Sequence, residues 1–283
     1  MPVLRRGSLN IDCIDEGKGP PVVLAHSSVS GNRQWKRLIE RLRGRYRVLA
    51  PNLLGYGKTT AWSEARTLTI EDAVQVLLGV CEGLEAPIRL VGHSWGGYLA
   101  IAAAQKLGER VSHIALYEPM MPGLLRGHGR AKAWEEASGV YADVRRLSGA
   151  KQWMELAHRF TDYFNGDGAW QATNAERREA VAALLPPNRH EWDAATQPVT
   201  TRALGPISAR GLLLCGTKTR LVLKDVVELL RDAFPDWRYV DVPGAGHMGP
   251  LTHPGEVNRL IAGFIRANPA RTARHLSATP IAA

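Results

Sequence analysis

The sequence of 283 residues has few cysteines and no long apolar segment. Its three cysteines, Cys13, Cys81 and Cys215, are odd in number and widely spaced. This pattern argues against a disulfide framework and predicts reduced, partly buried thiols. No stretch approaches the roughly 18 apolar residues that a membrane-spanning helix needs, and the first residues lack the apolar core of a signal peptide. We therefore expect a cytoplasmic protein with no membrane association.

The sequence also lacks repeats, metal-ligand spacings and nucleic-acid-binding motifs. The basic residues give a net charge of +9, but they are spread along the chain without interleaved aromatic residues. We expect no cofactor, no metal and no nucleic acid. We expect a small-molecule substrate, and the positive charge would favour an anionic one by raising the rate of encounter with anions. The composition is that of a globular protein, and nothing in it indicates the oligomeric state.

Short apolar segments alternate with amphipathic ones over most of the chain. Apolar segments near 21–26, 46–51, 88–92, 111–117, 211–215 and 237–242 predict buried strands of a parallel sheet. Helical patterns near 31–43, 69–83, 96–107, 223–233 and 254–266 lie between or after them. This alternation predicts an α/β fold with a doubly wound, mostly parallel sheet.

The alternation stops between residues 120 and 205, where the pattern is helical. Trp153, Ala157, Phe160 and Phe164 repeat at helical spacing and predict one apolar helix face. We therefore predict an inserted helical cap at 120–205, placed over the strand ends where open α/β sheets bind ligands. The core would comprise 1–119 and 206–268, and 269–283 would form a flexible tail.

The strongest motif is Gly92-His93-Ser94-Trp95-Gly96-Gly97, which fits G-x-S-x-G between a predicted strand and a predicted helix. In this context the tight turn presents the serine oxygen at the sheet edge and at a helix N-terminus. The small residues at 92 and 96 would let the chain pass close to itself. Ser94 is therefore the candidate nucleophile, and a plain tight turn is the alternative.

Four ordered segments together resemble the α/β-hydrolase family over about residues 8–266. They are 21–26 followed by Trp35, 50–59, the Ser94 turn, and the histidine loop Gly244-Ala245-Gly246-His247-Met248. The resemblance implies a serine enzyme with His247 as its general base, since a serine hydroxyl needs a base to become nucleophilic. Histidine suits that task because its pKa lies near neutrality.

The acid departs from the family's commonest pattern. The strand after the cap is followed by Gly216-Thr217-Lys218-Thr219, which places Thr219 where the family usually has aspartate. Glu118, at the end of the strand after the nucleophile's strand, is our candidate, as in certain haloalkane dehalogenases and lactonases. Asp225 is the alternative, and a triad without a functional acid is another.

The oxyanion hole is expected to use the backbone N–H groups of Trp95 and Ser28. Ser27 stands where the family often has glycine, and we place it with Trp35 in the substrate pocket. Packing of Trp35 in the core and a purely structural role for the serines are the alternatives.

The resemblance implies hydrolysis of a carboxylic ester or lactone through an acyl-serine intermediate. A carbon–carbon bond hydrolase, a cofactor-free perhydrolase or an acyltransferase could use the same residues. A ligand-binding receptor with little turnover is an alternative of another class. Haloalkane dehalogenases and epoxide hydrolases are disfavoured because both families have aspartate at the position of Ser94. Fold alone does not choose a substrate.

Overall fold

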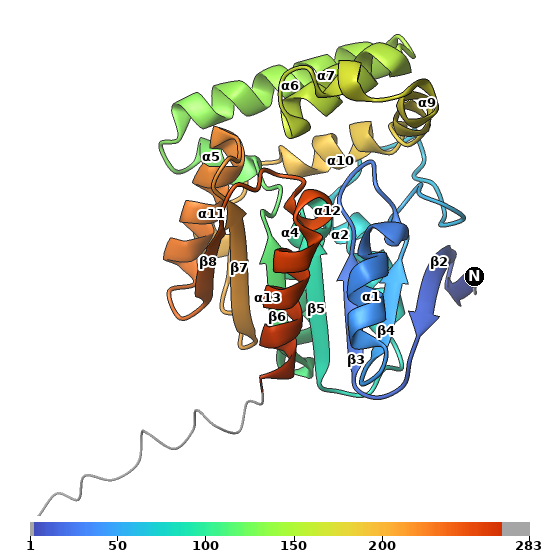
Figure 1. The fold of residues 1–283 in the computed structure, drawn as a ribbon, viewed down its shortest axis with the longest axis vertical. Helices are drawn as coiled ribbons and strands as arrows, with labels where there is room; N and C mark the ends of the chain where they lie inside the picture. Colours follow the sequence, from blue (N-terminus) through green and yellow to red (C-terminus); the bar gives the residue numbers. More distant parts are fainter. Residues whose placement is uncertain (1–2, 268–283) are drawn as a thin grey trace, which may run out of the picture.

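The computed structural model describes residues 3–267 and contains one eight-stranded sheet with helices on both faces (Figure 1). The strands are β1 (Val3–Arg6), β2 (Leu9–Glu16), β3 (Pro21–Ala25), β4 (Arg47–Pro51), β5 (Ile88–His93), β6 (Val111–Tyr117), β7 (Arg210–Gly216) and β8 (Arg238–Val242). Their order is β1-β2-β4-β3-β5-β6-β7-β8, and the strands from β3 to β8 pair in parallel. The predicted doubly wound, mostly parallel α/β sheet is confirmed.

Two antiparallel strands at one edge, β1 and β2, were not predicted from the sequence. In β2 the apolar residues alternate with acidic ones, so no continuous apolar segment marks it. One of these acids, Asp12, is buried and accepts hydrogen bonds from Nδ2 of Asn52 at 2.9 Å and from N–H of Lys58 at 3.2 Å. The strand therefore carries a polar contact to the loop after β4.

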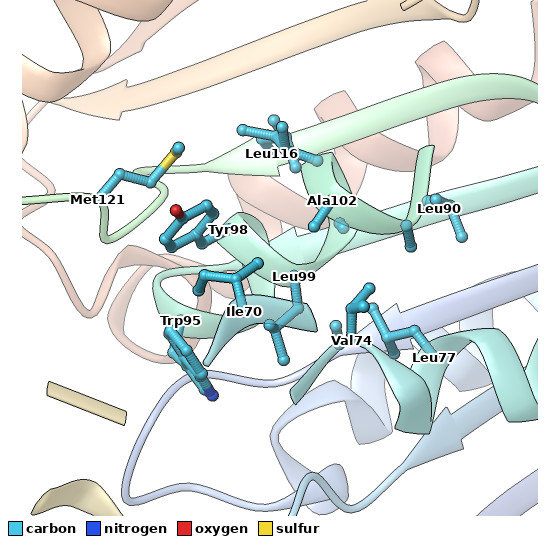
Figure 2. Packing of buried hydrophobic residues seen from close by; sticks show 14 of the residues in the cluster. Ile70, Val74, Leu77, Leu90, Trp95, Tyr98, Leu99, Ala102, Leu116 and Met121 are labelled. Atoms are coloured by element: carbon cyan, nitrogen blue, oxygen red, sulfur yellow. The ribbon is translucent and has the colours of Figure 1, made fainter. Parts of the chain in front are cut away.

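Two apolar layers hold the sheet between its helices. Helices α1 (Lys36–Leu42) and α13 (Pro254–Arg266) contact each other and contribute to one cluster. On the other side, α3 (Gln75–Cys81), α4 (Trp95–Leu107) and α11 (Leu221–Ala233) contribute to the larger cluster. Figure 2 shows part of it, with side chains of α4 packed beside those of α2 (Ile70–Ala73) and the start of α3. Both layers meet at β5, so the end of that strand is rigidly placed.

The segment between β6 and β7 forms the helices that lie across the carboxyl ends of the parallel strands (Figure 1). They are α5 (Gly123–Arg126), α6 (Ala131–Gly149), α7 (Trp153–Asn165), α8 (Ala169–Ala172), α9 (Ala175–Ala183) and α10 (Asn188–Ala195). The 3-10 helix η3 (Thr201–Leu204) follows them in the chain and contacts α4 and α11. A third apolar cluster joins them to the core, with Phe164 and Trp192 packing in one group with Val29, Met120 and Leu223.

The boundaries that we gave the cap and the core stay a prediction, and the proposed tail at 269–283 lies outside the described residues. None of the helices within 3–267 combines the length and the hydropathy that crossing a bilayer requires. All three cysteines are buried and free of disulfides.

Candidate active site

Ser94 occupies the turn between β5 and α4 and has a positive φ of 55°. Non-glycine residues rarely adopt this conformation, and a residue held in it stores strain. The turn can be this tight because its neighbours are glycines: a Cβ on Gly96 would collide with the carbonyl oxygens of Ala25 and His26. The local sequence thus fixes where the Ser94 hydroxyl points.

His247 lies in the loop between β8 and the short helix α12 (Gly249–Thr252). Its Nε2 atom is 2.9 Å from Oγ of Ser94, and its Nδ1 atom is 2.8 Å from Oε2 of Glu118. All three side chains are almost completely buried. The structure thus brings the predicted nucleophile, base and acid into one hydrogen-bonded chain, while their catalytic roles stay a prediction.

The carboxylate of Glu118 is held by donors on both of its oxygens. Oε1 accepts the N–H of Gly216 at 2.7 Å, and Oε2 accepts the hydroxyl of Thr219 at 2.8 Å as well as facing His247. An ionised carboxylate only accepts hydrogen bonds, so it places the proton of His247 on Nδ1. Nε2 is then free to accept the proton of Ser94.

Thr219, which occupies the position where the family usually has its acid, is therefore a hydrogen-bond partner of Glu118. Thr219 donates to Glu118, a role that we did not predict from the sequence. Asp225, our alternative acid, lies in α11 and faces Arg130 at 3.5 Å. The structure thus places Glu118, and not Asp225, at His247.

A second polar chain positions the histidine loop from the other side. Nε2 of His93 is 2.9 Å from the carbonyl oxygen of His247, and its Nδ1 is 3.1 Å from Nε2 of Gln34. Burial, reinforced by the charge of His247, lowers the pKa of His93 well below its ordinary value. The ring is therefore neutral, donates from Nε2 to His247 and accepts from Gln34.

Gln34 extends this chain to the loop after β3. Its Oε1 accepts both the N–H of Ser27 at 3.0 Å and the hydroxyl of Ser27 at 2.8 Å. The Ser27 hydroxyl also lies 2.8 Å from that of Ser30. We placed Ser27 in the substrate pocket, but both its N–H and its hydroxyl make hydrogen bonds to residues of this segment. Gln34 itself carries no motif that would have revealed its role.

The predicted oxyanion donors lie at two backbone positions. Trp95 is the first residue of α4, so its N–H has no intrahelical acceptor and sits at the positive end of the helix dipole. In the loop after β3, the N–H of Ser27 donates to Gln34 and that of Val29 donates to Oη of Tyr56. Ser28 lies between these two committed groups, which supports its assignment as the second donor.

Our prediction that Trp35 lines the substrate pocket is wrong. Trp35 lies at the end of the 3-10 helix η1 (Asn32–Trp35), is 1% exposed and packs in the cluster with Leu38 and Val22. It therefore belongs to the core on the α1 side of the sheet and not to a pocket. An aromatic residue after a strand end suits either position, so the sequence could not separate them.

A cavity of about 230 Å³ lies beside the nucleophile turn and under the cap. Its lining is Leu54, Gly55, Ala61, Trp62, Glu64, Leu68, Ala73, Trp95, Leu99, Ala183, Pro186, Pro187, His190 and Glu191. A second cavity of about 550 Å³ borders the histidine loop, and its lining includes His247, Lys218 and Arg220. Within residues 3–267, no group of three or more His, Cys, Asp or Glu side chains is arranged to hold a metal ion.

Glu191, on α10, is the buried carboxyl of the first cavity. Burial raises its pKa from 4.5 to about 7, although the nearby hydroxyls of Ser28 and Tyr56 and the amide of Asn188 favour the charged form. No sequence motif marked this residue, because its burial depends on how the cap sits on the core.

This pKa makes the stability of the protein depend on pH. The folded state holds the Glu191 proton more tightly than the unfolded chain does. Protonation of Glu191 therefore contributes to folding stability below about pH 4.5, and this contribution is lost as pH rises through about 7. We expect Glu191→Gln to gain stability relative to the wild type over this range, by at most on the order of 3 kcal/mol. Urea unfolding of both proteins at several pH values measures this difference, and parallel stability profiles would contradict it.

Comparisons with known proteins show the family to which the chain belongs. The sequence profile described as the Alpha/beta hydrolase family matches residues 22–260. The chain is 33% identical over 191 residues to 2-hydroxy-6-oxo-2,4-heptadienoate hydrolase of Pseudomonas putida, covering 66% of this chain and 67% of the relative. It is 25% identical over 255 residues to haloalkane dehalogenase 2 of Mycobacterium tuberculosis, covering 84% and 85%.

A thermophilic esterase from Thermogutta terrifontis has a similar fold, with a TM-score of 0.69 and 24% identity, covering 93% of this chain and 97% of that one. This likeness concerns the fold alone, whereas the profile match spans most of the sequence. The chain belongs to the alpha/beta hydrolase family and is a hydrolase.

Proposed function

We propose that the protein hydrolyses a carboxylic ester or lactone through an acyl intermediate on Ser94. The observation that carries this proposal is the buried chain from Ser94 Oγ through the His247 ring to Glu118. A serine hydroxyl that is hydrogen-bonded to a histidine, itself oriented by a carboxylate, is the arrangement that makes serine a nucleophile.

The reaction begins when Oγ of Ser94 bonds to the acyl carbon while its proton passes to Nε2 of His247. The carbonyl electrons move onto oxygen, where the N–H groups of Trp95 and Ser28 stabilise the negative charge. The tetrahedral intermediate collapses, the bond to the alcohol oxygen breaks, and His247 gives that oxygen its proton. Water then attacks the acyl-serine with His247 as base, which releases the acid and restores Ser94.

A serine nucleophile favours acyl transfer over dehalogenation, the reaction for which the haloalkane dehalogenase relative is named. Attack of Ser94 on a haloalkane would leave an alkyl ether, which has no carbonyl for water to attack. An acyl-serine has that carbonyl and can be hydrolysed by the same base. The burial of Ser94 and His247 beneath the cap further suggests a small or medium-sized substrate.

Cleavage of a carbon–carbon bond beside a ketone is the second candidate, because the 33%-identical relative is named as a dienoate hydrolase. A dienoate substrate carries a carboxylate. The first cavity offers it Glu64 and Glu191 and no lysine or arginine among its lining residues. Lysine and arginine occur in the second cavity, whose lining includes His247 but neither Trp95 nor Leu99. The charge of the first cavity thus favours an ester or lactone.

A substrate panel tests this ranking. We expect the wild type to hydrolyse para-nitrophenyl acetate and butyrate or a simple lactone with a higher kcat/KM than a 2-hydroxy-6-oxo-dienoate. A dienoate preferred by more than about tenfold would replace the ester proposal with the carbon–carbon hydrolase. Peroxide-dependent product would favour the perhydrolase, and binding without turnover on all substrates would favour the receptor.

A further inference from the structure

The hydrolytic steps make no use of Glu191, yet its carboxyl is buried inside the first cavity. The residue is only 4% exposed. Its Oε2 accepts a hydrogen bond from Nδ2 of Asn188 at 3.3 Å, whereas Oε1 is buried with no hydrogen-bond partner among the described residues. A buried acceptor without a partner costs free energy. Such a group calls for a ligand that supplies the missing donor.

The neighbours of Glu191 connect it to the expected oxyanion loop. The hydroxyls of Ser28 and Tyr56 lie close enough to the carboxyl to favour its charged form, while Oε1 itself has no hydrogen-bond partner among the described residues. Tyr56 in turn accepts the N–H of Val29 at 3.0 Å. The carboxyl therefore faces the same loop that is expected to hold the carbonyl oxygen of the substrate, and a bound substrate would reach it.

The remaining lining defines the kind of group that fits. Apolar and aromatic side chains form most of the walls, including Trp62 and Trp95. The other carboxylate, Glu64, is already paired, with His190 at 3.2 Å and Arg189 at 3.5 Å. Within the described chain, no lysine or arginine lines this cavity to neutralise Glu191. Glu191 is thus the unsatisfied acceptor in a largely apolar space.

We propose that this cavity binds a hydrogen-bond donor of the substrate, an ammonium or a hydroxyl group, through Oε1 of Glu191. The inference rests on the proposed function in that the rest of the substrate is the ester at Ser94. Glu191 then selects substrates whose apolar body ends in a donor, because an analogue without the donor would leave the buried oxygen unpaired. Hydrogen bonds to charged groups correspond to roughly 10- to 100-fold in affinity.

The two kinds of donor respond differently to pH. An ammonium binds best when Glu191 is ionised, so its affinity should rise between pH 6 and 8. A hydroxyl can pair with either form and should respond less. The other titrating or charged groups near this carboxyl are accounted for: the pKa of Tyr56 is raised well above its ordinary value, so Tyr56 stays neutral. On α10 itself, Asp193 is bound by Arg145, and His190 and Arg189 face Glu64.

Matched ligands test the proposal without depending on turnover. Two series of probes are used. In the first, phenyl benzoates carry a para-ethyl, para-hydroxymethyl or para-aminomethyl group on the benzoate ring. In the second, phenyl acetates carry the same three groups on the phenol ring. Binding of each to Ser94→Ala is measured by calorimetry at pH 6 and 8, and hydrolysis of each by the wild type is measured in parallel. In at least one series, we expect the donor-bearing esters to bind about 10- to 100-fold more tightly than the ethyl ester.

Variants of residues on α10 test whether Glu191 causes the preference for donor-bearing esters. Adding Glu191→Leu to Ser94→Ala should abolish the preference, and adding Glu191→Gln should keep it for the hydroxyl and lose it for the ammonium. Asp193→Asn removes a buried carboxyl from the same helix outside this cavity and should keep both preferences. Equal affinity for the three substituents in both series, or a preference that survives Glu191→Leu, would overturn the inference. Failure of the wild type to hydrolyse any ester would count against the proposed function instead.

Discussion

Ser94→Ala is expected to lower kcat for ester hydrolysis by about 10⁵- to 10⁶-fold, with little change in stability. The variant leaves His247 and Glu118 in place but removes the atom that bonds to the acyl carbon. Alanine has a Cβ like serine, so it demands no more space in the turn, although the positive φ remains. Steady-state release of para-nitrophenol measures the effect.

A matched serine shows whether the loss is specific. Ser112 lies on β6, next to the nucleophile's strand, and its hydroxyl contacts the carbonyl oxygen of Ile88. Ser112→Ala removes a hydroxyl from the same sheet and should keep activity within a few-fold of the wild type. Substantial activity in Ser94→Ala would show that another residue is the nucleophile.

Glu118→Gln is expected to lower kcat by about 10³- to 10⁴-fold. The carboxylate now receives donors from Gly216, Thr219 and His247. An amide has only one oxygen, so its NH₂ group would face one of these donors or force His247 into the other tautomer. In that tautomer Nε2 carries the proton and cannot take the one from Ser94. The same ester assay measures the loss.

Two further variants separate the acid from its surroundings. Thr219→Ala removes one donor to Glu118 and should lower kcat by about tenfold or less, because the N–H of Gly216 still holds the carboxylate beside His247. Asp225→Asn breaks only the contact with Arg130 and should behave like the wild type. An active Glu118→Gln together with an inactive Asp225→Asn would reverse our assignment of the acid.

The parallel core and the chain Ser94–Glu118–His247 could be anticipated because local sequence carries their signals. Six apolar segments marked β3 to β8, and glycines around Ser94 marked a turn that only small residues permit. Glu118 followed from its place at a strand end once Thr219 was seen to lack a charge. Strand order and helix bounds then bring the three side chains together.

The rest depends on contacts between segments far apart in the sequence. Gln34 becomes informative only when the fold sets it between His93 and Ser27, and Glu191 only when the cap covers it. The acidic residues of β2 hid a strand next to the sheet edge because their partners lie elsewhere in the chain, such as Asn52 for Asp12 and Arg47 for Asp15. Trp35 was misplaced for a related reason: pattern alone does not tell on which side of a sheet an aromatic side chain will pack.

Reaction with an alkyl fluorophosphonate, followed by mass spectrometry of the digested protein, tests the central claim most directly. Phosphonates bond to an activated serine and mimic the tetrahedral intermediate. We predict one phosphonyl group, on the peptide that contains Ser94, with matching loss of esterase activity, no label in Ser94→Ala and much slower labelling of Glu118→Gln. Labelling of another residue, or an unlabelled Ser94 in a protein that still hydrolyses esters, would contradict the account.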